Sequence, residues 1–567
     1  MKRPYIFIFS LLSLLTLNSC SDLLDTTSEL VEFEQDNTLN HPTDSVYSVL
    51  GILNTMQTIA DRTVLLGEVR GDLVIATDAA SADLKNLSAF DLSQTNKYNQ
   101  VSDYYAVINN CNYYLAHVDT ALERRGRKVF EQEYAVVKAY RAWTYLQLVQ
   151  AYGQVPLVTT PLMTEQAARE AMNQPYKDIT EVCNYFIDDL TPYAYTLLPN
   201  FGTIDGWMSR QFFIPMRVLL GDLCLWAGRY EESARWYNSF LNDEKSPVLM
   251  RTTNRSTWPD PSEFRIPNDA YYVTTTAELL SFIPMEEQIF NGTVSDLRNI
   301  FVSTNENKYY YQLTPSTAMY TISADQTYCM EYKTDARTDT IYVPKTGLLD
   351  DIYRGDLRFN SNFYQYSHLG GVDNYSEESS IGQSVYKFWS ALVPTYRITM
   401  VYLRYAEALN RAGYPQSAMA ILKYGLCTDN AALYVDSVEQ QKAGALIAFD
   451  NNVFTKETTI GVHSLGSGDS QANGLYVLPQ PDKALATRED TVDYQIPLVE
   501  DMIVTEMALE GAFEGNRYYD LMRVALRRGE ESYLADPISR RGGIVDEALR
   551  SKLMDKANWY LPLPKTR

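Results

Sequence analysis

The chain has 567 residues, with 71 Asp and Glu against 49 Lys and Arg, which gives a net charge of −22. A surface this acidic repels phosphate backbones and excludes nucleic acid as a partner. The length is ample for a large hydrophobic core. Solubility alone is a sufficient explanation for the acidic net charge.

Residues 1–19 are predicted to be a signal peptide. Two basic residues precede an apolar run that ends at Leu17, and the small Ser19 stands directly before Cys20. The run is too short for a permanent membrane span. A small residue followed by Cys at this place is the cleavage site of bacterial lipoproteins, so Cys20 is expected to be lipidated. The alternative is an ordinary secretory signal with an incidental cysteine.

Residues 20–42 are predicted to form an acidic tether. No Lys or Arg occurs between Arg3 and Arg62. A tether without basic residues does not adhere to an anionic lipid surface. We therefore expect a solvated spacer that holds one domain, residues 43–567, away from the membrane.

Amphipathic periodicity predicts three helices in the first part of the domain. One starts near Asp44 and continues past Met56, and a second runs from about Tyr105 toward Glu123. The third, expected to be the longest, ends at Tyr152 before a glycine. Arg141 lies within its apolar stripe, where a buried guanidinium needs a carboxylate partner, so we assign it to a structural ion pair.

Two later segments have the residue spacing of tetratricopeptide repeats. The first runs from Leu220-Gly221 through Gly228 and Tyr230 to Tyr237, and the second extends from Tyr405 to Ala418. Small residues at these positions let two helices approach closely, and the aromatic residues fill the gap between repeats. The predicted fold is therefore mainly α, a solenoid of TPR-like helical hairpins.

Two long inserts, at about 246–394 and 425–500, show weak periodicity and are rich in Tyr, Thr, Asn, Gly and Pro. They are predicted to be irregular, to carry only a few short β-hairpins such as one at Thr340–Val343, and to gather on one face as the binding surface. The Ser/Gly-rich stretch 461–474 is predicted to be a mobile loop.

Neither a metal nor a cofactor is expected. Apart from Cys20, the cysteines are few, widely spaced and without a CxxC pair, which argues against disulfides and zinc. Three of them, Cys111, Cys183 and Cys224, lie in apolar helical runs and are expected in the core. No catalytic sequence motif is present.

A charged segment near the C-terminus is interpreted as structural. Glu506, Glu510 and Glu514 follow at i, i+4 spacing, and Arg517, Asp520 and Arg523 continue at i, i+3. Such spacing predicts a ladder of ion pairs on one helix. The alternative is a carboxylate pair for glycoside hydrolysis, but neighbouring arginines hold carboxylates ionised, which does not suit a general acid.

Aromatic and polar residues in predicted loops are the candidates for ligand contact, because tyrosine and tryptophan rings stack on sugar faces and also suit peptides. The charged turn at residues 68–72 either orients a polar ligand or caps a helix. The candidates are Arg70, Asp72, Phe90, Asn96, Tyr98, Trp258, Tyr271, Tyr272, Tyr309, Tyr310 and Tyr311.

The segment Phe513-Glu514-Gly515-Asn516-Arg517 with Asp520-Leu521 and Arg523, read with Leu17-Asn18-Ser19-Cys20, resembles the SusD/RagB family of Bacteroidetes lipoproteins. The chain also resembles that family at several other places in the same order. These are Arg141-Ala142 to Tyr152-Gly153, Val155-Pro156-Leu157, Leu313-Thr314-Pro315-Ser316, Asp356-Leu357-Arg358-Phe359, Tyr402-Leu403 with Tyr405-Ala406-Glu407-Ala408, and Tyr560-Leu561-Pro562-Leu563-Pro564.

The resemblance implies a function in nutrient capture without catalysis. It implies a protein anchored by lipid on the cell-surface side of the outer membrane, where it forms the lid of a SusC-like TonB-dependent transporter. The expected ligand is an oligosaccharide; an oligopeptide, or glycoside hydrolase activity, are the alternatives. The family's ligand-binding residues vary, so none is transferred to this chain.

Overall fold

The computed structural model describes residues 42–204, 206–243, 278–286, 292–301, 312–333, 338–343, 355–358, 363–365, 383–388, 392–468 and 476–563. The predicted signal peptide, the lipidation residue Cys20 and all of the tether but its last residue lie outside this part of the chain. No helix among the described residues is long and apolar enough to cross a membrane.

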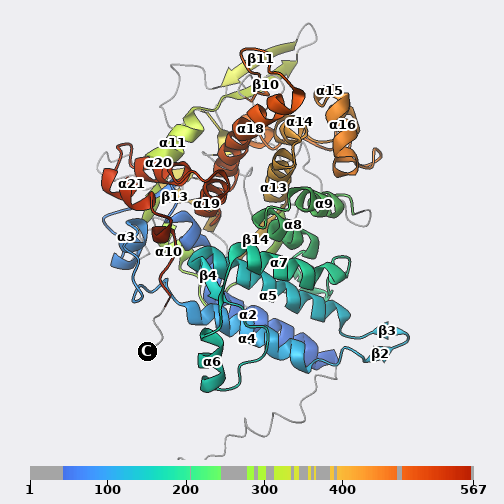
Figure 1. Cartoon of the computed structure of the whole chain (residues 1–567), viewed down its shortest axis with the longest axis vertical. Helices are drawn as coiled ribbons and strands as arrows, with labels where there is room; N and C mark the ends of the chain where they lie inside the picture. Colours follow the sequence, from blue (N-terminus) through green and yellow to red (C-terminus); the bar gives the residue numbers. More distant parts are fainter. Residues whose placement is uncertain are drawn as a thin grey trace, which may run out of the picture.

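Helices stack in chain order to form the body of the molecule (Figure 1). Each helix in the series α4, α5, α7, α8, α9, α13 packs on the next, and α13 also packs on α14 and α18. The bounds are α2 Pro42–Glu68, α4 Val101–His117, α5 Glu131–Tyr152, α7 Ile179–Leu190, α8 Met216–Trp226, α9 Tyr230–Leu241, α13 Ile398–Arg411, α14 Pro415–Met419, α18 Arg488–Glu510 and α19 Arg517–Arg528.

The first three predicted helices are confirmed as α2, α4 and α5, with two corrections. The helix expected to be longest, α5, has 22 residues, fewer than the 27 of α2. α4 ends at His117 because the chain turns into a hairpin of β2 (Glu123–Arg124) and β3 (Arg127–Lys128). Arg125 and Gly126 between them both have positive φ, the geometry of a tight two-residue hairpin turn.

The predicted close approach of helices in the first repeat is confirmed. A Cβ atom on Gly221 of α8 would lie 2.5 Å from Cε1 of Tyr237 on α9, so only glycine fits there. The ring is fixed because its hydroxyl donates to Asp222 at 2.5 Å. The second repeat forms the hairpin of α13 and α14, in which Ala418 is buried.

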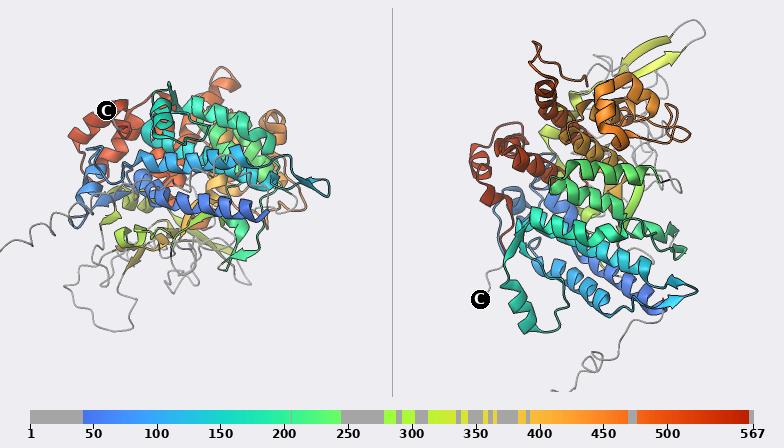
Figure 2. Two further views of the ribbon diagram at one scale, coloured as in Figure 1. Left: turned by 90° about the horizontal axis from the view of Figure 1, so that it is seen from below. Right: turned by 45° about the vertical axis from the view of Figure 1, so that its right-hand side comes forward.

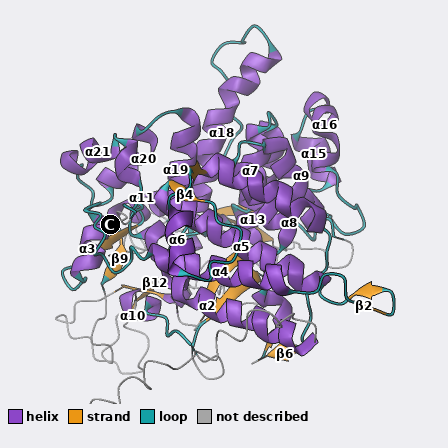
Figure 3. Cartoon of the chain, turned by 60° about the horizontal axis from the view of Figure 1, so that its bottom comes forward, coloured by secondary structure: helices purple, strands orange, loops and turns teal. Residues whose placement is uncertain are grey.

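The described strands are short and pair only in twos, as expected for hairpins on a helical body (Figure 3). The hairpin predicted at Thr340–Val343 is confirmed. Besides β2 with β3, the pairs are β1 (Val74–Ala76) with β9 (Leu313–Pro315), β4 (Gln154–Pro156) with β5 (Tyr176–Asp178), β6 (Thr203–Ile204) with β7 (Trp207–Met208), β8 (Leu279–Pro284) with β14 (Leu392–Arg397), β10 (Tyr328–Lys333) with β11 (Thr338–Val343), and β12 (Phe363–Gln365) with β13 (Gln383–Val385).

The described strands of the first insert lie mainly on one side of the helical stack (Figure 2). The second insert is more ordered than predicted, since it contains α15 (Thr428–Tyr434), α16 (Ser437–Ala443) and the start of α18. The small helices α10 (Leu297–Phe301) and α11 (Thr317–Ala324) belong to the first insert.

The expectation of a mobile loop at 461–474 is wrong for its described part, residues 461–468. These residues are buried and include the helical turn α17 (Ser464–Ser467). Their glycines permit close packing: a Cβ on Gly461 would lie 2.1 Å from the carbonyl carbon of Lys423, and one on Gly466 would lie 2.0 Å from Asp356. The high glycine content reflects packing of the backbone and not mobility.

One continuous core runs through the stack, and Cys111, Cys183 and Cys224 lie in it, as predicted. Arg141 is 5% exposed and forms an ion pair with Asp189 at 3.0 Å, so it has the carboxylate partner that its buried position requires.

Candidate functional site

The turn between α18 and α19 is pressed against the end of α2, which accounts for the glycine of the charged motif. Gly515 has φ of +87°, and a Cβ there would lie 2.4 Å from the carbonyl oxygen of Thr63. A Cβ on Gly67 would lie 1.7 Å from the carbonyl oxygen of Gly515. The N–H of Gly515 donates to the fully buried carboxylate of Glu68 at 2.8 Å.

Arg70 and Asp72, predicted as ligand contacts, are buried and bound to the scaffold. Arg70 donates to the carbonyl oxygen of Trp559 at 2.9 Å and to the Tyr519 hydroxyl at 3.0 Å. Asp72 accepts two hydrogen bonds from Arg517, at 2.6 and 2.8 Å. These contacts tie the segment after α2 to the C-terminal helices, so we correct the assignment of both residues from ligand binding to structure.

Three further candidates lie in the interior as well. Phe90 packs 5.8 Å from the ring of Tyr518, and Asn96 donates to the carbonyl of Asp83 while accepting from the N–H of Tyr98. Phe90, Asn96 and Tyr98 are each no more than 6% exposed. A surface ligand does not reach them, so their assignment is corrected too. The remaining candidates, Trp258, Tyr271, Tyr272, Tyr309, Tyr310 and Tyr311, lie outside the described residues.

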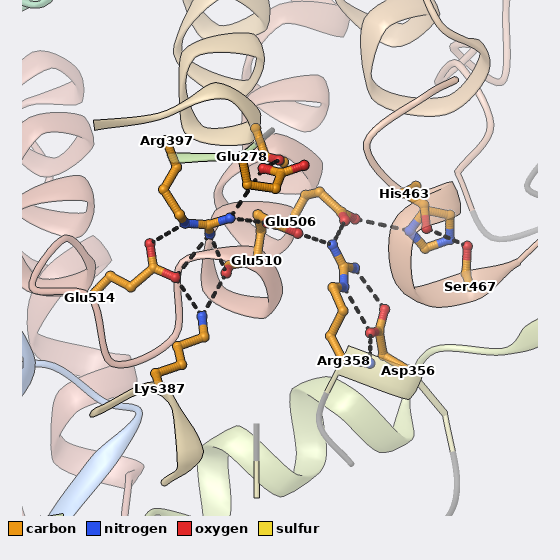
Figure 4. Close-up of polar contacts among 11 residues, drawn as sticks. Glu278, Asp356, Arg358, Lys387, Arg397, His463, Ser467, Glu506, Glu510 and Glu514 are labelled. Atoms are coloured by element: carbon orange, nitrogen blue, oxygen red, sulfur yellow. Dashed lines mark hydrogen bonds and ion pairs between the residues drawn. The ribbon is translucent and has the colours of Figure 1, made fainter. Parts of the chain in front are cut away.

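Arg358 is the centre of a buried cluster of charges (Figure 4). It is fully buried and forms ion pairs with Asp356 at 2.6 Å, with Glu510 at 3.1 Å and with Glu506. Glu506 also contacts Nδ1 of His463 at 2.9 Å. In the Asp356-Leu357-Arg358 segment noted in the sequence, the buried guanidinium of Arg358 therefore joins Asp356 to the carboxylates of α18.

Arg397 and Lys387 extend the cluster toward the turn after α18. Arg397 pairs with Glu510 at 3.0 Å and with Glu514 at 2.8 Å, and Lys387 pairs with Glu514 at 2.5 Å. Arg397 also lies 3.5 Å from Glu278. The cations come from the first insert and its edge, and three of the carboxylates, Glu506, Glu510 and Glu514, come from the C-terminal segment.

The electrostatics of this cluster do not suit acid–base catalysis. Burial alone would raise the pKa of Glu506, but Arg358 and His463 bring this pKa down to about 2. Burial is likewise outweighed at Glu514, whose pKa is lowered by Arg397 and Lys387. Carboxylates held in the ionised form do not act as general acids near neutral pH.

The predicted ladder of neighbouring ion pairs forms only at one step, Asp520 with Arg523 at 2.9 Å. Glu514 lies in the turn after α18 and not on the helix, and Arg517 pairs with Asp72 instead of its neighbours. Arg523 pairs mainly with Glu407 of α13, at 2.5 Å. Partners from distant segments replace the local ones.

A surface groove of about 470 Å³ lies at the edge of this scaffold, between β1 and α3 (Ala82–Ser88) on one side and α20 (Ser532–Arg540) and α21 (Glu547–Leu553) on the other. This volume is within the roughly 300–1,000 Å³ typical of ligand sites. Its lining includes Ile75, Lys85, Asp91, Ile538, Arg541 and Lys552.

The groove combines apolar walls with fixed polar groups. Arg541 is 8% exposed and donates to the carbonyl oxygens of Val69 and Gly71 at 3.1 and 3.0 Å. Burial lowers the pKa of Arg541 to about 10. At the rim, Lys552 pairs with Asp91 at 2.6 Å. Such a lining suits a ligand with many hydroxyl or amide groups.

None of the groove residues between positions 70 and 98 is among the ligand contacts predicted from the sequence. In this part of the chain the groove is lined by residues that include Ile75, Ala76, Lys85 and Asp91. No group of three or more His, Cys, Asp or Glu among the described residues is arranged to hold a metal ion.

No protein-family model and no curated protein matches this sequence. Solved structures do match. A SusD superfamily protein from Bacteroides vulgatus is 13% identical over 93% of this chain and 97% of its own, with a TM-score of 0.59. The chain has the SusD-like fold. The resemblance seen in the sequence is thus confirmed at the level of the fold.

Two further structures with the SusD-like fold are described by the ligands they bind. A SusD-like carbohydrate-binding protein from Bacteroides fragilis is 15% identical over 87% of this chain and 88% of its own, with a TM-score of 0.54. A laminarin-binding SusD-like protein is 16% identical over 92% of this chain and 95% of its own, with a TM-score of 0.50.

Glu68 gives a pH-dependent prediction. Burial raises its pKa to about 7, although backbone N–H groups including that of Gly515 lower it. The neutral carboxyl therefore contributes stability that is complete below pH 4.5 and is lost as the pH rises through 7. Glu68→Gln keeps this group neutral, so its free energy of unfolding should increase relative to the wild type between pH 4.5 and 8, by on the order of 1–3 kcal/mol.

Denaturant titrations of both proteins across this pH range measure the difference directly. A difference that stays constant with pH would contradict the raised pKa of Glu68.

Proposed function

We propose that this protein is a cell-surface lipoprotein that binds an oligosaccharide and delivers it to a SusC-like TonB-dependent transporter, of which it forms the lid. The observation that carries the proposal is the SusD-like fold, which matches solved structures over 85–95% of this chain. Some of those proteins are carbohydrate-binding by description.

An oligosaccharide is the ligand class that these observations favour. The groove offers apolar walls next to Arg541 and Lys552, which suits hydroxyl-rich chains, and an oligopeptide is the alternative with the same chemistry. Glycoside hydrolysis is disfavoured because Glu506 and Glu514 are buried in ion pairs that keep them ionised. The chain is thus proposed to bind its ligand without cleaving it.

The proposed binding activity is tested with the Cys20→Ala protein, which remains full in length but lacks the acylation site. Calorimetry against panels of oligosaccharides and oligopeptides is expected to find reversible binding to at least one glycan, and mass analysis is expected to recover that glycan intact. Binding of peptides alone would contradict the proposed ligand class. Product that accumulates in proportion to protein would contradict a function limited to binding.

The groove is tested by filling it. Ala548 is exposed and lines the groove, so Ala548→Trp is expected to weaken glycan binding without disturbing the core. Ala432→Trp, at an exposed position of α15, is the matched control and should bind as the wild type does. Equal glycan affinities of the two variants would show that the binding site lies outside the groove.

Anchoring is proposed from the sequence around Cys20. Acyl chains on Cys20 would hold the protein to the outer membrane, because two or more such chains anchor a protein stably. Cys20→Ala is therefore expected to move the folded protein from the membrane fraction to the soluble fraction in cells that lack the transporter. Retention in the membrane fraction would refute the anchor.

A further inference from the structure

A pair of aromatic rings lies apart from the groove, where the turn before the first repeat meets α9. Tyr195 follows the short helix η2 (Thr191–Tyr193) and is 70% exposed. Trp236 of α9 is half-buried, and its ring centroid lies 6.3 Å from that of Tyr195 with an angle of 52° between the rings. The two rings form an open angle and do not stack on each other.

Arg217 of α8 supports this pair from within. Its Cζ lies 5.2 Å from the Tyr195 centroid and 6.0 Å from that of Phe240. The guanidinium is itself fixed, because it donates to Asp243 at 2.5 Å and to the carbonyl oxygen of Ser239 at 2.5 Å. Arg217 covers part of the Tyr195 ring, and the 70% exposure leaves the rest open to solvent.

The backbone holds Tyr195 in place. The N–H of Ala194 donates to Thr191 and that of Thr196 donates to Tyr193, at 3.2 and 3.0 Å, and Ala194 is buried. A ring presented from a fixed turn loses little conformational entropy when a ligand covers it.

We propose that Tyr195 and Trp236 form a stacking subsite for a pyranose ring of an oligosaccharide, distinct from the groove. An aromatic face is electron-rich, and the C–H groups on one face of a sugar ring are its natural complement. Nε1 of Trp236 is buried and has no hydrogen-bond partner among the described residues, so the subsite depends on contact with the ring faces and not on this donor. This inference rests on the proposed binding of oligosaccharides.

The size of the patch favours a sugar over a protein partner. Tyr195 and Leu197 are the exposed large apolar side chains of this described turn. A stable protein interface buries about 800 Å² on each partner, far more than two side chains supply. One or two sugar rings match the area available.

Tyr195→Ala tests the subsite in the Cys20→Ala background. Affinity electrophoresis in gels that contain laminarin, amylopectin, xylan or mannan identifies a glycan that the parent protein binds. We expect Tyr195→Ala to weaken that binding about 3- to 10-fold, the effect of one lost ring contact. Tyr195→Phe should retain the affinity, because the hydroxyl makes only a 3.4 Å contact with Ser239.

Tyr185→Ala is the matched control, since Tyr185 is also exposed, at 38%, but packs edge-on against Phe186. It should bind as the parent does. Equal glycan affinities of the parent protein and the Tyr195→Ala variant would overturn the subsite and leave the proposed function standing. A parent that binds none of these glycans and none in the calorimetric panel would overturn both. Loss of transporter association with unchanged glycan affinity would show that the patch contacts protein.

Discussion

The buried ion pairs around Arg358 and Arg397 are the interaction on which the rest of the structure depends. They join the first insert to α18, across more than a hundred residues of sequence. Burying these charges costs solvation energy, which only a complete set of partners offsets, so the segments must assemble together. The insert is thereby fixed to the helical stack, and the carboxylates of the charged C-terminal motif are committed to holding the fold.

Because these buried charged side chains bind one another, ligand contact is left to residues at the surface. Asp72 and Arg517 bind each other, and Glu68 secures the turn at Gly515. Glu514 and Arg523 of the charged motif are likewise paired within the fold. The groove beside α3 and α21 and the rings of Tyr195 and Trp236 are surface features supported by that rigid interior. A binding protein benefits from this arrangement, because fixed side chains lose little entropy on binding.

Much of the fold could be predicted from the sequence, and little of the site. Helices follow from local periodicity, and the contact of Gly221 with Tyr237 follows from repeat spacing. The prediction of a continuous ladder of ion pairs was wrong because Arg517 pairs with Asp72, 445 residues away, and no local pattern reveals such a partner. The prediction of a mobile loop in the glycine-rich stretch was wrong for its described part, because composition does not distinguish a flexible backbone from a tightly packed one. The groove joins residues 75–91 to residues 538–552, which only the folded chain brings together.

The most direct test of the scaffold role is the free energy of unfolding of Arg358→Met. Three carboxylates would lose their buried partner, so we predict a loss of about 3–5 kcal/mol. Arg169→Met, which removes an exposed pair with Glu165 on α6 (Glu165–Met172), should cost less than about 1 kcal/mol. Equal stability of the two variants, with glycan binding lost only in Arg358→Met, would show that the cluster is a functional site and not the scaffold.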